Sequence, residues 1–78
     1  MATLEAALAQ GLEHHRAGRL AEAEALYRSI LEAFPQHAES LHLLGVIALQ
    51  AGQPAAAVDL IGRAMATGAV SVDMLFHL

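Results

Sequence analysis

The side chains of this chain that could carry chemistry are five histidines, eight carboxylates and a few hydroxyls, because the chain contains no cysteine. Glu13, His14 and His15 are adjacent, but neighbouring helical positions point about 100 degrees apart and cannot share one small cation. His42 and His77 are expected at similar heights on two neighbouring helices, where two imidazoles lack a third ligand. The sequence therefore predicts no bound metal and no other cofactor.

The sequence supports nucleophilic catalysis no better than it supports metal binding. Without cysteine the nucleophile would be a hydroxyl, and Thr3, Ser71 and Ser40 have simpler roles at the starts of helices. No pair of carboxylates with an apolar pocket is evident, and no glycine-rich phosphate loop follows a strand. We expect a non-catalytic protein.

Charge and hydropathy limit the kinds of partner that the protein can have. Four Lys and Arg residues and a formal net charge of −4 argue against a nucleic-acid-binding surface. The longest apolar run, Leu43 to Leu49, is far shorter than the roughly 18 residues of a membrane span. The first residues lack the basic region of a signal peptide. We therefore expect a cytoplasmic protein without a membrane partner.

Helix start and stop residues divide the chain into four helices and the beginning of a fifth. Thr3 can cap the first helix, Pro35 breaks the second, and Pro54 suits the first turn of the fourth. The expected helices run from Thr3 to Ala17-Gly18, from Leu20 or Ala21 to Pro35, from about Ala38 to Gln50, from Pro54 to Thr67-Gly68, and from Ser71 to Leu78.

Apolar residues spaced three and four apart define the faces that these helices should bury. The expected inward residues are Leu20, Ala23, Tyr27, Ile30, Leu31 and Phe34 of the second helix, Leu41, Leu44, Gly45, Ile47 and Ala48 of the third, and Ala57, Leu60, Ile61, Ala64 and Met65 of the fourth. His14 is expected to be a packed core residue with a backbone partner.

A single constant shift along the sequence superimposes one half of the chain on the other. Gly11 recurs as Gly45, and Ala17-Gly18 recurs as Ala51-Gly52. Small residues thus recur where two helices approach closely or where a helix ends. A period of about 34 residues with helical composition is typical of stacked helical repeats.

The repeat resembles the tetratricopeptide family over nearly the whole chain. The first copy supplies Ala7, Gln10-Gly11, His14, Ala23, Tyr27 and Pro35, and the second supplies Leu41, Leu44-Gly45, Ala48, Ala57, Ile61 and Ala69. The usual Trp is absent from both copies. The resemblance implies an all-α solenoid of antiparallel helix pairs, as one domain over residues 1–78. Repeat one would cover about 4–37, repeat two about 38–71, and a partial third repeat 72–78.

The resemblance also implies a concave face, lined by the first helix of each repeat, that binds a protein or peptide partner. The residues expected on this face are Leu8, Leu12, His15, Glu39, His42, Leu43, Val46, Leu49 and His77. The Lys, Asn and Arg clamp of chaperone-binding members is missing, since Leu8, Leu12, Val46 and His77 occupy those places. The Asn ladder of glycosyltransferase-linked members is missing too. What remains is an apolar groove rimmed by Glu5, Glu39 and Asp73.

Two other functions stay open at this stage. The chain could be the N-terminal segment of a larger enzyme of glycosyltransferase type. It could also be a structural homo-oligomer, because Val72 to Leu78 or the apolar groove could be covered by a second copy.

Overall fold

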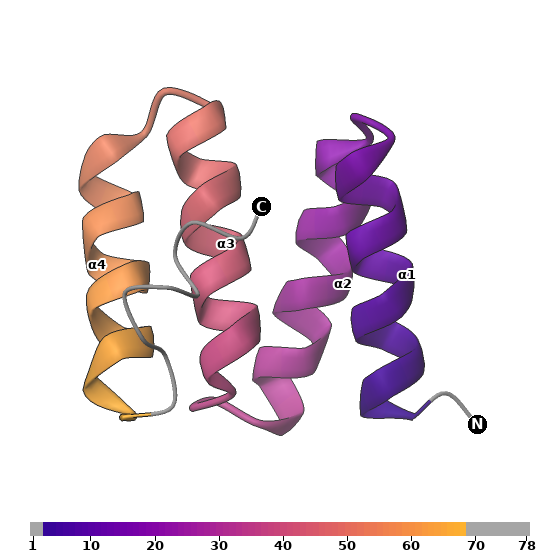
Figure 1. The fold of residues 1–78 in the computed structure, drawn as a ribbon, viewed down its shortest axis with the longest axis horizontal. Coiled ribbons are helices and arrows are strands. Elements are labelled where there is room, and N and C mark those ends of the chain that lie inside the picture. The colour runs from indigo at the N-terminus through magenta and orange to yellow at the C-terminus, as the bar shows by residue number, and fades with distance from the viewer. Residues whose placement is uncertain (1–2, 69–78) are drawn as a thin grey trace.

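The computed structural model of the chain describes residues 3–68. Within this range the chain forms four helices and no strand: α1 Leu4–Arg16, α2 Leu20–Ala33, α3 Ala38–Gln50 and α4 Pro54–Ala66. Figure 1 shows the helices side by side in chain order, as two antiparallel hairpins with α1 and α4 at opposite ends. The all-α solenoid arrangement is confirmed, whereas the fifth helix expected from Ser71 lies outside the described residues.

A side chain accepts a free backbone amide at the start of α1 and of α3, whereas α2 and α4 begin without a side-chain cap. Thr3 Oγ1 accepts a hydrogen bond from the Ala6 amide at 3.0 Å, and Pro54 occupies the first turn of α4, as expected. The cap of α3 is His37, whose Nδ1 accepts the Ser40 amide at 3.2 Å. Because that nitrogen is an acceptor, the Ser40 hydroxyl 2.8 Å away must donate to it. This histidine cap was not predicted.

The turns inside the two hairpins are copies of each other. Gly18 and Gly52 have φ angles of +82° and +74°, a conformation that glycine adopts without steric cost. Arg19 donates its amide to the His14 carbonyl, and Gln53 donates to the Ala48 carbonyl, both at 2.8 Å. Each turn therefore uses the same glycine end and the same hydrogen bond, at equivalent positions of the two repeats.

Two other glycines allow the helices of each hairpin to pack closely. A Cβ atom at Gly11 would lie 2.5 Å from Cε1 of Tyr27, and one at Gly45 would lie 2.5 Å from Cγ1 of Ile61. Neither distance is compatible with a side chain larger than hydrogen unless a neighbour moves. The expectation that these glycines serve close packing is therefore confirmed.

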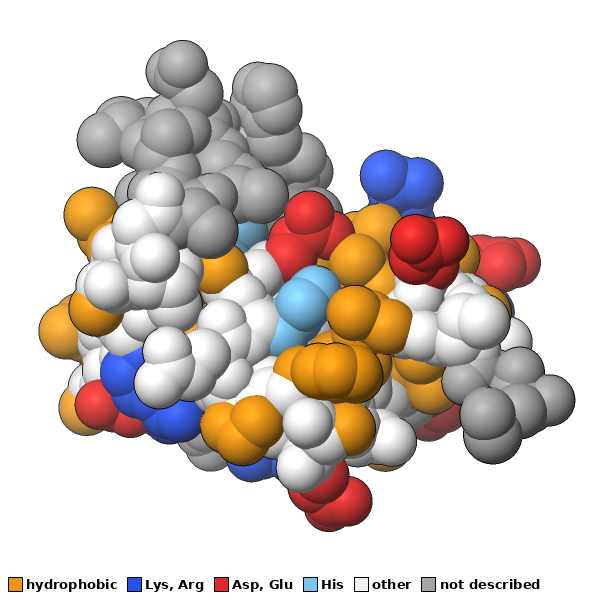
Figure 2. Space-filling view, turned by 90° about the horizontal axis from the view of Figure 1, so that it is seen from below, with side chains coloured by type: hydrophobic (Ala, Val, Ile, Leu, Met, Phe, Trp, Pro, Cys, Tyr) orange, Lys and Arg blue, Asp and Glu red, His pale blue; other side chains and the backbone are white. Residues whose placement is uncertain are grey.

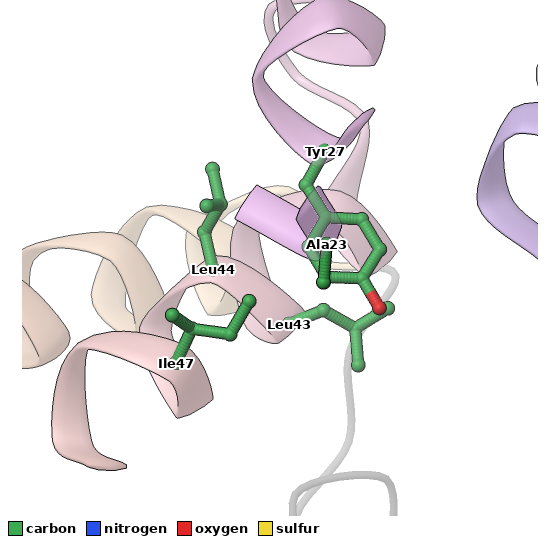
Figure 3. Close-up of a cluster of buried hydrophobic side chains, with 5 residues drawn as sticks. All are labelled: Ala23, Tyr27, Leu43, Leu44 and Ile47. Carbon is green, nitrogen blue, oxygen red and sulfur yellow. The ribbon is translucent and has the colours of Figure 1, made fainter. Parts of the chain in front are cut away.

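The core lies between the two hairpins. Ala23 and Tyr27 of α2 pack with side chains of α3, and Figure 3 shows Leu43 reaching toward the Tyr27 ring. A second cluster joins α3 to α4 through Leu41 and Ala64. All of the expected inward residues of α3 are buried, namely Leu41, Leu44, Gly45, Ile47 and Ala48.

Three expectations about inward residues were wrong. Phe34 is 51% exposed, because it follows the last residue of α2 and its φ of −133° takes it out of the helical stripe. Met65 is 46% exposed, whereas its counterpart in the preceding repeat, Leu31, packs against α3. His14 is half-buried, and its Nδ1 accepts a hydrogen bond from Arg19 Nε at 2.7 Å instead of using a backbone partner.

Candidate functional site

A hydrogen bond between the two hairpins marks the face that the sequence assigns to partner binding. His15, in the last turn of α1, and Gln50, at the end of α3, meet through Nε2 and Oε1 at 2.7 Å. Since an amide oxygen only accepts, the proton lies on Nε2 of His15. This contact between α1 and α3 brings the predicted partner-binding faces of the two helices together at one end.

The apolar candidates differ in exposure. Leu8 and Leu12 of α1 are half-buried and pack against the core cluster, and Val46 of α3 is also half-buried. Leu49 is 55% exposed and is the most accessible of these side chains. Leu43, which was expected in the groove, is buried in the core against Tyr27, because α3 is covered on more than one side.

Of the predicted polar residues that the structure describes, two are buried and one is half-buried. His15 is 8% exposed and makes an edge contact with Tyr27, with ring centroids 6.3 Å apart. His42 is 3% exposed, and Glu39, one turn earlier, is half-buried. The last predicted site residue, His77, lies outside the described residues.

Burial shifts the pKa values of Tyr27 and His42, beneath this face, in the direction that favours their neutral forms. It raises the pKa of Tyr27 to about 12, although Arg16 opposes the shift and Glu39 adds to it. Burial also lowers the pKa of His42, and the Glu39 carboxylate offsets part of that shift. Within the described part of the chain, the Tyr27 hydroxyl, His42 Nε2 and His15 Nδ1 have no hydrogen-bond partner. The layer beneath the candidate face thus contains three buried polar atoms without a hydrogen-bond partner.

A hollow that the sequence did not predict is lined by residues of α2, α3 and α4. Its volume is about 310 Å³, and it is lined by Arg28, Leu31, Glu32, Leu44, Leu60 and Arg63. Arg28 Nε lies 2.8 Å from Glu24, and Arg63 lies 3.8 Å from Asp59. Each guanidinium therefore already has a carboxylate on its own helix, which weakens the case for an anion site here.

The described residues hold no group of three or more His, Cys, Asp or Glu side chains that could bind a metal ion. In the same part of the chain, no helix has the length and hydropathy needed to cross a membrane.

Comparison with known proteins gives one match. The family model described as "Tetratricopeptide repeat" matches residues 14–72, which is most of the chain and includes α2, α3 and α4. No curated protein and no solved structure matches the chain.

Proposed function

Because the chain belongs to the tetratricopeptide repeat family, we propose that it is a non-catalytic interaction module that binds a partner peptide or helix through the face shared by α1 and α3. Tetratricopeptide repeats generally mediate contacts between proteins. The finer proposal concerns which side chains make the contact and which kind of partner they select.

The observation that carries the proposal is the hydrogen bond between His15 and Gln50. Leu12 precedes His15 by three positions and Val46 precedes Gln50 by four, so each lies one helical turn before the bonded pair. Leu49 is next to Gln50 and is more than half exposed. An apolar contact surface at the junction of the two helices follows from these positions.

The chemistry of this surface favours an amphipathic helix as the partner. Half-buried leucine and valine side chains with an exposed Leu49 suit apolar anchors at helical spacing. Glu5 and Glu39 lie on the same helices and favour basic residues beside those anchors. The partner would thus present an apolar stripe with Lys or Arg at its margins.

Selection of displayed amphipathic-helix peptides against the 78-residue chain tests the proposal, followed by fluorescence anisotropy on the selected peptides. Leu49→Glu should weaken binding at least about tenfold, because it places a carboxylate among the apolar anchors. Leu12→Glu with Val46→Glu should weaken it further. Ala25→Glu, on the exposed side of α2, is the matched control.

Circular dichroism must show that each variant keeps its helices. If folded Leu49→Glu binds the selected peptides as tightly as the parent chain does, while Ala25→Glu abolishes binding, the partner surface is not the one proposed.

A further inference from the structure

The solvent-facing sides of α2 and α4 differ although the two helices occupy equivalent places in the repeat. α2 has four charged side chains, and at each equivalent position α4 has an uncharged, small or apolar residue. The pairs are Glu22 and Ala56, Glu24 and Val58, Arg28 and Gly62, and Glu32 and Ala66. The exposed charges of α4, Asp59 and Arg63, stand where α2 has Ala25 and Ser29, so the side of the helix that is charged in α2 is uncharged in α4.

Five uncharged residues of α4 are exposed on one side of the helix, which we call the outer face of α4: Ala55, Val58, Gly62, Met65 and Ala66. They follow one another at steps of three and four, apart from the adjacent pair Met65 and Ala66, so they share one side of the helix. Val58 is 74% exposed, the highest value among the large hydrophobic residues of the described chain. In Figure 2, which views the molecule from below, hydrophobic side chains lie at the left edge, the side on which Figure 1 has α4, with basic and acidic groups near them.

Gly62 lies at the centre of this face without a role in the described chain. A Cβ atom there would meet nothing within 4 Å, in contrast to Gly11 and Gly45. Glycine is the least favourable helix residue apart from proline, so a helical glycine with free space beside it calls for another explanation. The absence of a side chain lets a second helix backbone approach closely at this point.

The charges along one edge of the face are self-complementary. Asp59 and Arg63 are separated by one turn, both are more than half exposed, and their charged atoms are 3.8 Å apart. When two copies of one helix pack antiparallel about a two-fold axis, the same edge of each helix meets. Asp59 of one copy then faces Arg63 of the other, and the reverse holds at the opposite end.

We propose that the outer face of α4 binds the same face of a second copy of this chain, with the two α4 helices antiparallel and Gly62 at the crossing point. The two-fold pairing buries Val58 and Met65 and matches Asp59 with Arg63 across the interface. This surface lies on a different helix from the partner-binding face of α1 and α3, so self-association leaves that face open.

Sedimentation velocity of the full chain, from about 1 µM to about 1 mM, tests the pairing, and a reversible dimer is expected. Val58→Glu with Gly62→Arg gives α4 the residue pair that α2 has at Glu24 and Arg28, so the monomer keeps a favourable helix. The dissociation constant of this variant should rise about 100-fold or more. Ala25→Glu, on the exposed side of α2, is the control and should dimerise as the parent does.

Reversal of single charges identifies the partner as a second α4. Asp59→Arg and Arg63→Asp should each weaken self-association, because each makes the edge carry one sign of charge. An equimolar mixture of the two variants should restore a dimer that contains one copy of each. A parent chain that stays monomeric to about 1 mM overturns the proposal. So does a dimer that persists unchanged in Val58→Glu with Gly62→Arg, since another surface would then hold it.

Discussion

In each hairpin a glycine of the first helix lies against a large side chain of the second helix, but that side chain differs between the hairpins. Gly11 faces Tyr27 in the first hairpin, and Gly45 faces Ile61 in the second. Tyr27 is fully buried, whereas Ile61 is only half-buried. Equivalent positions in a repeat can therefore differ in how much stability they provide, because the neighbouring hairpin covers one of them and not the other.

The first helices of the two hairpins also differ in burial, but here the helix of the second hairpin is the more buried one. α3 lies between α2 and α4 and buries nine of its 13 residues, whereas α1 is at one end and buries only Gly11 and His15. Place in the stack and residue type both contribute, since α3 is also the more apolar of the two helices. Each of the following predictions tests one part of this comparison.

The largest effect is expected at the residues that oppose the two glycines. Tyr27→Ala should lower the free energy of unfolding by about 3–5 kcal/mol, because it removes a fully buried aromatic ring. Ile61→Ala should cost about 1–2 kcal/mol less than that, because part of its side chain is already in water. Urea titrations followed by circular dichroism measure both. Equal losses would show that the two hairpins are covered alike.

The glycines should respond to alanine in opposite senses. Gly11→Ala should cost about 1–3 kcal/mol, since its Cβ would lie against the buried Tyr27 ring. Gly62→Ala should instead raise the stability of the monomer by about 0.5–1 kcal/mol, because the space beside it is free and alanine favours the helix. Melting at low protein concentration separates this gain from any change in self-association. A loss of stability in Gly62→Ala would contradict the geometry of α4.

Acidification should weaken the covered helix α3 through His42. Burial lowers the pKa of His42 below 6.5 in the folded chain, so between that lowered pKa and 6.5 the unfolded chain binds more protons. Stability should therefore fall as the pH drops below 6.5. Urea titrations from pH 7.5 to about 5 measure the slope, which His42→Leu should reduce. An unchanged slope in that variant would mean that other groups carry the acid sensitivity.

The smallest effect concerns the two exposed ion pairs of the second helices. Glu24→Ala should cost about 0.3–0.5 kcal/mol, because Arg28 Nε lies 2.8 Å from that carboxylate. Asp59→Ala should change monomer stability by less than that, since the distance to Arg63 is 3.8 Å. Thermal melts at low and high salt compare the pairs. A larger loss from Asp59→Ala would show that the α4 pair is the stronger one.

Sequence reasoning placed the helix boundaries well because their causes are local. A threonine cap, two prolines and two Ala-Gly turns act within a few residues of the ends that they define. Burial was harder to predict, because it depends on helices that lie far away in the sequence. The family resemblance placed Leu43 on an exposed concave face, although a helix as apolar as α3 is generally covered on several sides.

The partner-binding face stays a prediction, and the structure adds one contact between the two helices that carry it. The register of the repeat led to the first helices of both hairpins, and the structure joins those helices through His15 and Gln50. The pairing itself could not be deduced, because a bond across 35 positions requires the tilt between hairpins. Nor could the contrast between the exposed sides of α2 and α4 be recognised as a surface until the core faces were known.

The duplicated turn has a consequence for how such a chain can change in length. The turns at Gly18 and Gly52 form the same backbone hydrogen bond. The turn of each hairpin is therefore stabilised within that hairpin and needs no specific neighbouring repeat. Unequal recombination that adds or removes one whole repeat in register would leave every remaining turn intact. Arrays of this kind can therefore grow or shrink by whole units within a gene, while selection acts on the surfaces that each added unit presents.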